Sequence, residues 1–204
     1  MKKCNACLVL VMVVVMLVTG CTKEESVNPF QGKWTGSVDM TEHVVNSMVT
    51  ENENLKDFLD FEQLTFSLEF EFAEESVSLH VEETSKQQFI TNMKAGVVKM
   101  VDAMVADVAT KNDTTAADIY NGMGVTRDEY IQSVVESLKI EELVSSMASA
   151  LELNGSYEYN DEKIVVLYED DTYEEMTYTL GIEDLTITVS DGTNSFVIPC
   201  SKAN

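Results

Sequence analysis

The side chains that could support catalysis or bind a metal do not form a recognisable motif. His43 and His80 are the two histidines, and no third ligand lies at metal-binding spacing from either. No serine lies in a motif that supplies a catalytic base. The carboxylate-rich stretches 160–162 and 169–171 lack the spaced oxygen ligands and central glycine of a calcium loop. The sequence therefore predicts that the protein is not an enzyme and binds no metal or cofactor.

One cysteine, by contrast, lies in a context typical of covalent modification. A positively charged start with two lysines is followed by the uninterrupted apolar run Leu8–Val18. Two small residues, Thr19 and Gly20, then precede Cys21. At eleven residues the run is too short to cross a bilayer core about 30 Å thick. The segment therefore predicts export and processing, not a permanent transmembrane helix.

The sequence around Cys21 resembles the lipobox of bacterial lipoproteins. The resemblance implies that residues 1–20 are a signal peptide and that the thiol of Cys21 receives a diacylglyceryl group before cleavage. Cys21 would then be the first residue of the mature chain, and residues 21–30 would be a polar, lipidated tether. Acyl chains such as palmitate contribute about 0.8 kcal/mol per buried CH₂ and hold a protein firmly in a bilayer. We therefore expect a lipid-anchored protein on the extracytoplasmic side of the cell membrane.

The strongly acidic composition limits the partners of this protein. The formal net charge is −23, and without residues 1–20 the chain keeps 11 basic and 36 acidic side chains, a net charge of −25. A charge of this size repels phosphate backbones, which excludes nucleic acid as a partner. Cys200 has no cysteine to pair with once Cys21 is acylated, so we expect a small apolar core residue there.

Alternating apolar and polar residues predict a domain over residues 31–204 that is mainly β. The alternation is strictest from Leu64 to Phe72, which is typical of an antiparallel strand with one buried face. Eight such strands joined mostly by short turns favour a closed antiparallel up-and-down barrel. The predicted strands are 32–40, 63–72, 76–83, 153–159, 163–168, 173–181, 184–190 and 194–200.

Between the third and fourth strands the apolar period becomes helical, which predicts a helical insert over residues 85–151. Ser85 with Gln88, and Thr126 with Glu129, have the spacing of capping boxes that begin helices. A last helix, Ile140–Leu151, has one apolar stripe that is formed by Leu143, Met147 and Leu151.

The domain resembles the lipocalin-like proteins, or calycins. The resemblance rests on the Gly32-Lys33-Trp34 start together with the run of short antiparallel strands. It implies an eight-stranded barrel whose closed end is plugged by Trp34. Lipocalins pack a late arginine across this tryptophan, whereas here the single arginine, Arg127, lies in the insert. Lys202 is a basic residue that could substitute for it. The fold hosts several functions and does not by itself identify one.

Two hypotheses about function follow. In the first, Trp34, Phe66, Phe70 and Phe72 line the barrel, which binds a small hydrophobic ligand. The helices of the insert would then form a lid that includes Met93, Met100 and Met104, because methionine adapts to varied apolar partners. In the second, the barrel is filled, the methionines pack between helices, and the insert contacts a protein partner in a structural or interaction role. A cavity above roughly 300 Å³ would favour the first hypothesis.

Overall fold

The computed structural model describes residues 28–190 and 195–203. The chain divides into two units, Met1–Phe30 and Gln31–Asn204, and the fold below is that of the second unit. The predicted signal peptide 1–20, the acylated Cys21 and most of the tether 21–30 lie outside the described residues.

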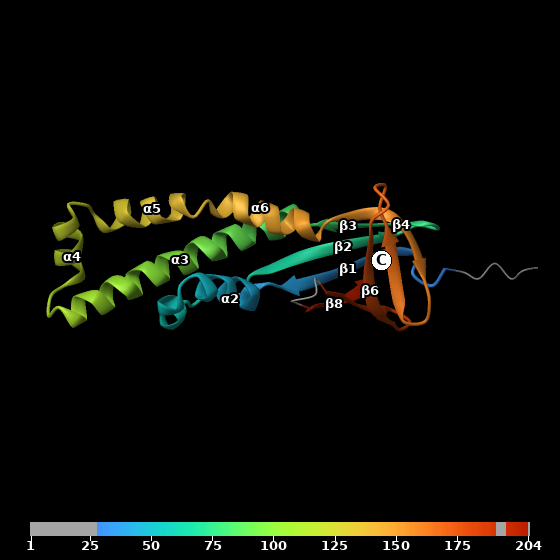
Figure 1. Cartoon of the computed structure of the whole chain (residues 1–204), viewed down its shortest axis with the longest axis horizontal. Helices are drawn as coiled ribbons and strands as arrows, with labels where there is room; N and C mark the ends of the chain where they lie inside the picture. Colours follow the sequence, from blue (N-terminus) through green and yellow to red (C-terminus); the bar gives the residue numbers. More distant parts are fainter. Residues whose placement is uncertain (1–27, 191–194, 204) are drawn as a thin grey trace, which may run out of the picture. The chain divides into compact units, whose positions relative to one another are not determined.

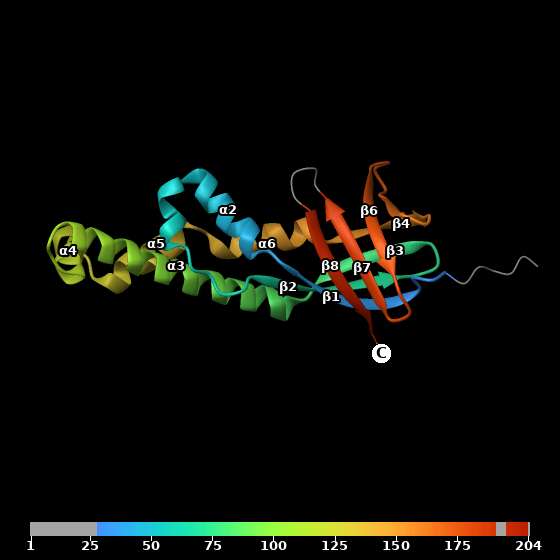
Figure 2. The same cartoon turned by 90° about the horizontal axis from the view of Figure 1, so that it is seen from below.

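Eight strands form a closed barrel in which each strand pairs antiparallel with its neighbours along the chain and β8 pairs with β1 (Figure 2). This order is that of an up-and-down barrel, which removes the open edges of a sheet. The structure therefore confirms the predicted fold class. The strands are β1 (Gly32–Asp39), β2 (Thr65–Phe72), β3 (Ser76–Val81), β4 (Leu153–Tyr159), β5 (Lys163–Leu167), β6 (Tyr173–Leu180), β7 (Asp184–Ser190) and β8 (Ser195–Lys202).

The core of the barrel is formed by every second residue of its strands. In β2, Phe66, Leu68, Phe70 and Phe72 are buried, whereas the residues between them are half-buried or exposed. Trp34 of β1 is the register partner of Phe70, so both side chains point to the same face. The strict alternation in the sequence thus corresponds to one filled face and one solvated face.

Closure of the barrel depends on a glycine in β1. A Cβ atom on Gly36 would lie 2.7 Å from both the Sγ atom of Cys200 and the carbonyl oxygen of Pro199. Any side chain at this position would therefore separate β1 from β8.

Cys200 is buried, as predicted, and its burial raises the pKa of the thiol to about 12.

Helices fill two connections between strands. The first holds α2 (Thr41–Glu51) and the short 3₁₀ helix η1 (Glu53–Phe58), between β1 and β2. The second is the predicted insert between β3 and β4, confirmed as α3 (Glu83–Lys111), α4 (Ala116–Met123), α5 (Arg127–Ser137) and α6 (Ile140–Leu151). β1 and β3 end, and β2 and β4 begin, at the same end of the barrel, so all these helices are attached there. Figure 1 shows α3 and α6 side by side, and the two helices are in contact.

The start of α3 differs from the prediction. The Ser85–Gln88 capping box is wrong, because the helix begins at Glu83 with no side-chain cap. Glu82 donates its backbone N–H to Ser67, so strand pairing continues up to the residue before the helix. The Ser85 hydroxyl donates to the carbonyl of Glu82, and the Gln88 amide donates to Asn92.

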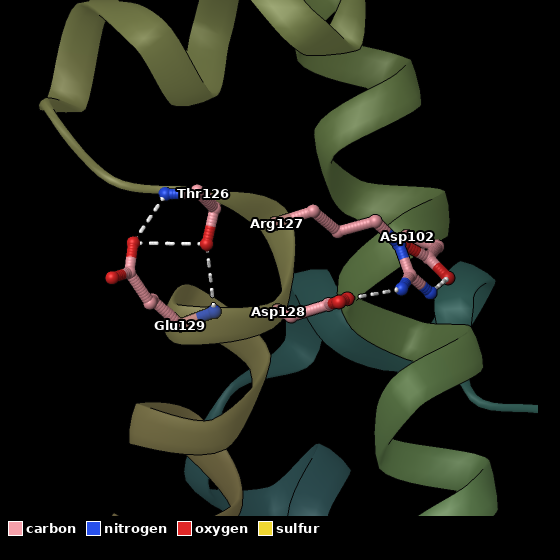
Figure 3. A network of polar contacts seen from close by, with 5 residues as sticks. All are labelled: Asp102, Thr126, Arg127, Asp128 and Glu129. Carbon is pink, nitrogen blue, oxygen red and sulfur yellow. Dashed lines mark hydrogen bonds and ion pairs between the residues drawn. The ribbon is translucent and has the colours of Figure 1, made fainter.

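The start of α5 confirms the second predicted capping box (Figure 3). The Thr126 hydroxyl accepts a hydrogen bond from the backbone N–H of Glu129, whose carboxylate accepts one from the backbone N–H of Thr126 at 2.8 Å. The backbone and then the side chain of Thr126 hold the pKa of Glu129 below its ordinary value. The next residue, Arg127, donates to both carboxylate oxygens of Asp102 at 2.8 and 2.6 Å. This bidentate contact attaches α5 to α3.

Candidate functional site

The four aromatic residues that the sequence analysis assigned to a ligand-lined barrel lie in its packed core. Trp34, Phe66, Phe70 and Phe72 are each at most 1% exposed. The Phe66 ring stacks on Phe89 of α3 with 4.4 Å between ring centres. Phe70 stacks with Phe72, whose ring meets that of Tyr157 edge to face at 5.3 Å. These side chains contact one another and the insert, which is the arrangement of a filled interior.

A basic side chain covers Trp34 at one end of the barrel. Lys202 of β8 is the register partner of Trp34. Its Nζ atom lies 5.4 Å from the centre of the tryptophan ring, within cation–π range. Arg127, by contrast, lies in α5 and contacts α3. Lys202, and not the single arginine of the sequence, thus lies across the ring of Trp34.

A groove with a mostly apolar lining lies among the helices. Its volume is about 420 Å³, with α2 and η1 on one side and α3, α5 and α6 on the other. Figure 2 shows how α2 stands apart from the insert helices. We call this feature the helical groove. Its lining comprises four methionines, further apolar residues and a few polar ones: Met48, Met93, Met100, Met147, Val44, Leu55, Val134, Leu138, Leu143, His43, Ser47, Glu51 and Asn52.

The predicted lid methionines divide between two environments. Met93 and Met100, two turns apart on α3, line the helical groove. Met104 follows one turn later, is half-buried, and is not part of the lining. The structure therefore brings two of the three residues to one site.

Helix α6 faces the helical groove because it is apolar on two sides. Its buried face consists of Ile140, Val144 and Ala148. Leu143 and Met147, which the sequence analysis placed in the main stripe, line the groove instead. Leu143 is 44% exposed. A helix with two apolar faces is stable where a second partner covers the remaining one.

Hydrogen bonds fix both ends of the groove wall that is formed by α2 and η1. At the start of α2, the Thr41 hydroxyl accepts a hydrogen bond from the backbone N–H of Leu64 at 2.8 Å. After η1, the Asn92 amide on α3 donates to the carbonyl of Gln63 at 3.0 Å. Residues between these two points, including Met48 and Leu55, face the groove. The spacing of Val44 and Met48 is typical of a helix with one apolar face, and this is the signal for the wall that the sequence contains.

A second, larger concavity of about 750 Å³ lies beside the β5–β6 turn and includes Ser76, Asn154 and Ser156. Most of its lining residues have polar side chains, and its Asp170 carboxylate already accepts hydrogen bonds from the backbone N–H and hydroxyl of Thr172. We assign the candidate site to the helical groove, because apolar side chains from five helices converge there.

The side chains that the sequence analysis considered as metal ligands are dispersed. His43 lies on α2, where its ring meets that of Phe196 edge to face at 5.8 Å, and His80 is exposed on β3. The Asn160 side chain caps its own turn by accepting hydrogen bonds from the backbone N–H groups of Glu162 and Lys163. Within residues 28–190 and 195–203, no three His, Cys, Asp or Glu side chains are grouped to hold a metal ion.

No protein-family model, curated protein or solved structure matches this chain. Among the helices of the described residues, none has the length and hydropathy required to span a bilayer.

Proposed function

We propose that this protein is a lipid-anchored extracytoplasmic lipoprotein that binds a small hydrophobic molecule in the helical groove. The observation that carries the proposal is the groove itself. Its volume of about 420 Å³ is within the range of small-molecule sites, roughly 300–1,000 Å³, and its lining is mostly apolar. Four methionine thioethers give the walls an adaptable surface.

In this proposal the barrel is the platform and the ligand lies beyond its end. The complete burial of Trp34, Phe66 and Phe70 supports this arrangement, since these side chains already fill the interior with one another. Phe89 continues the same packing into α3, from which Met93 and Met100 project into the groove. A rigid core beneath the site would hold its lining in place.

We also propose that the chain is a divergent lipocalin-like protein. The eight-stranded up-and-down barrel, the Gly32-Lys33-Trp34 start at β1 and the lysine across the tryptophan support this assignment. The insert is larger than is typical of that family, and it supplies most of the proposed site.

The proposed anchor would be joined to the barrel at the end away from the helices. β1 begins at Gly32, and it reaches the helix-bearing end only at Asp39. Acylation of Cys21 would therefore tether the barrel through the residues that precede β1.

A protein partner in the same region is the alternative. Exposed apolar side chains on the insert favour it, since Val108, Met123, Leu138 and Leu143 are 39–45% exposed. Such a surface on a folded protein often marks an interface.

Fluorescence of N-phenyl-1-naphthylamine, a neutral hydrophobic probe, distinguishes the two functions. The test uses residues 22–204, which contain the complete unit 31–204. We expect the probe to bind, and we expect Met147→Trp, which fills the groove, to abolish binding. Ile182→Trp is the control, because Ile182 is 95% exposed in the turn between β6 and β7. Absence of probe binding to the unaltered chain would refute the ligand-binding proposal.

A further inference from the structure

The charge at the helical groove indicates which class of ligand it accepts. Glu51 is the one carboxylate among the lining residues, and neither lysine nor arginine belongs to the lining. Within the described part of the chain, no basic side chain lies within ion-pair distance of Glu51. The polar part of the groove therefore has a negative charge with which no basic side chain of the described residues forms an ion pair.

The position of Glu51 on α2 adds to this negative potential. It is the last residue of the helix, and the last turn holds no basic residue. The carbonyl groups of a last turn carry the negative end of the helix dipole, so an acidic side chain there is unfavourable for the helix alone. A cation placed at this end would interact favourably with both the carboxylate and the dipole.

The two lysines next to lining residues on the insert side of the groove are paired with carboxylates, whereas Lys56 of η1, next to Leu55, is exposed, is not part of the lining and has no carboxylate within ion-pair distance among the described residues. Lys94, next to Met93, contacts Glu141, and its hydrogen bond lowers the pKa of that glutamate. Lys139, next to Leu138, contacts Glu142 at 2.9 Å. On the insert side, an anionic head group would have to displace one of these carboxylates before it could pair with Lys94 or Lys139.

We infer that the helical groove selects amphiphiles with an apolar tail and a cationic head, and that it discriminates against anionic ones such as fatty acids. The inference rests on the proposed ligand-binding function and adds its charge selectivity. In the bound state, the tail lies against the methionines and the head lies at Glu51. Without residues 1–20 the net charge of −25 attracts such cations from solution and repels carboxylates.

Displacement of the naphthylamine probe measures this selectivity. The competitors share a dodecyl tail: dodecyltrimethylammonium is cationic, dodecanoate is anionic, and dimethyldodecylamine N-oxide is neutral overall. They are compared at about pH 8 and low ionic strength, below their micelle-forming concentrations. We expect the cation to displace the probe at a concentration about tenfold lower than the anion, with the neutral compound between them. Added salt should reduce the difference.

Two matched variants locate the source of the selectivity. Glu51→Gln should reduce the ratio between cation and anion several-fold and leave the neutral competitor unchanged. Glu42→Gln removes the same charge from the same helix, at an exposed position outside the groove lining, and should leave the ratio nearly unchanged.

The outcomes separate the two proposals. If the probe binds and dodecanoate displaces it as well as the cation does, the charge selectivity is wrong while ligand binding stands. If the two variants reduce the ratio equally, net charge and not Glu51 causes the preference, and the assignment of the head-group position is wrong. If the probe does not bind at all, the proposed function fails and this inference fails with it.

Discussion

The ring of Phe61 packs directly against the backbone of Gly96 in α3. This contact, together with the hydrogen bond from Asn92 to Gln63, attaches the segment after η1 to the insert. A Cβ atom at position 96 would overlap the phenylalanine ring. The glycine is therefore required by packing, although it lies in the interior of a helix where glycine is unfavourable.

Gly96→Ala should destabilise the protein. Alanine gains about 1 kcal/mol in helix propensity, but overpacking against Phe61 costs about 1–3 kcal/mol. In a Phe61→Leu background, where the overlap is smaller, the same substitution should be less destabilising or even stabilising. Gly122→Ala in α4 is the control, because a Cβ atom there meets no atom within 4 Å, and it should stabilise the protein by about 0.5–1 kcal/mol. Urea unfolding monitored by circular dichroism measures these three changes.

The strands could be predicted closely from the sequence, because the barrel gives each strand one buried and one solvated face. β2 shows this most clearly, since the buried residues Phe66, Leu68, Phe70 and Phe72 alternate with residues that are half-buried or exposed.

The helical groove could not be predicted in this way. In α6 both the set Ile140, Val144 and Ala148 and the pair Leu143 and Met147 have helical spacing, so no local signal decides which face contacts α3.

The position of α2 is a second feature that local sequence does not determine. Val44 and Met48 predict one apolar face, but the wall that this face meets comes from residues about 50–100 positions further along the chain. Likewise, glycine is required at position 96 only because the Phe61 ring packs against it in the folded protein. Both facts depend on tertiary contacts between the η1 segment and the insert.

Burial of Cys200 predicts a specific dependence of stability on pH. The folded state raises the pKa of the thiol to about 12, above its ordinary value of about 9. The folded state therefore holds this proton more tightly than the unfolded state does. The corresponding stabilisation is complete below about pH 9 and is lost as the pH rises toward 12. Other groups titrate in this range, so Cys200→Ala is the reference, and its free energy of unfolding should fall less steeply between about pH 9 and 11.

The same burial predicts slow chemical labelling of the thiol. In a chain that begins at residue 22, Cys200 is the one remaining cysteine, so reaction with a thiol reagent reports on it alone. At about pH 8 the folded protein should react far more slowly than the protein in denaturant. Labelling of the folded protein at the rate of the unfolded chain would contradict the placement of Cys200 in the core.

Cys21→Ala should release the protein from the membrane. The prediction follows from the proposed acylation and from the lack of another long apolar run after residue 20. To separate export from anchoring, the variant should be tested with an unrelated cleavable signal peptide in place of residues 1–20. Recovery of this exported variant in the membrane fraction after a salt wash would show that the anchor lies elsewhere in the chain.

The insert between β3 and β4 should be removable without loss of the barrel. Leu79 pairs with Leu153, and this register places Val81 opposite Leu151. Replacement of residues 82–150 by an Asn-Gly turn would therefore join the two strands as a hairpin. We expect the shortened protein to keep its β circular dichroism but to be less stable, because Phe66 loses its stacking partner Phe89.

The shortened protein also tests where the ligand binds. Removal of α3, α5 and α6 eliminates one wall of the helical groove but leaves Trp34, Phe70 and Phe72 in the barrel. Loss of naphthylamine binding with retention of the β signal would agree with a site in the groove. Retained binding would place the ligand inside the barrel, as in the first hypothesis from the sequence. Loss of the β signal itself would show that the helices are an integral part of the core, because contacts such as that between Phe66 and Phe89 would then be necessary for the barrel to close.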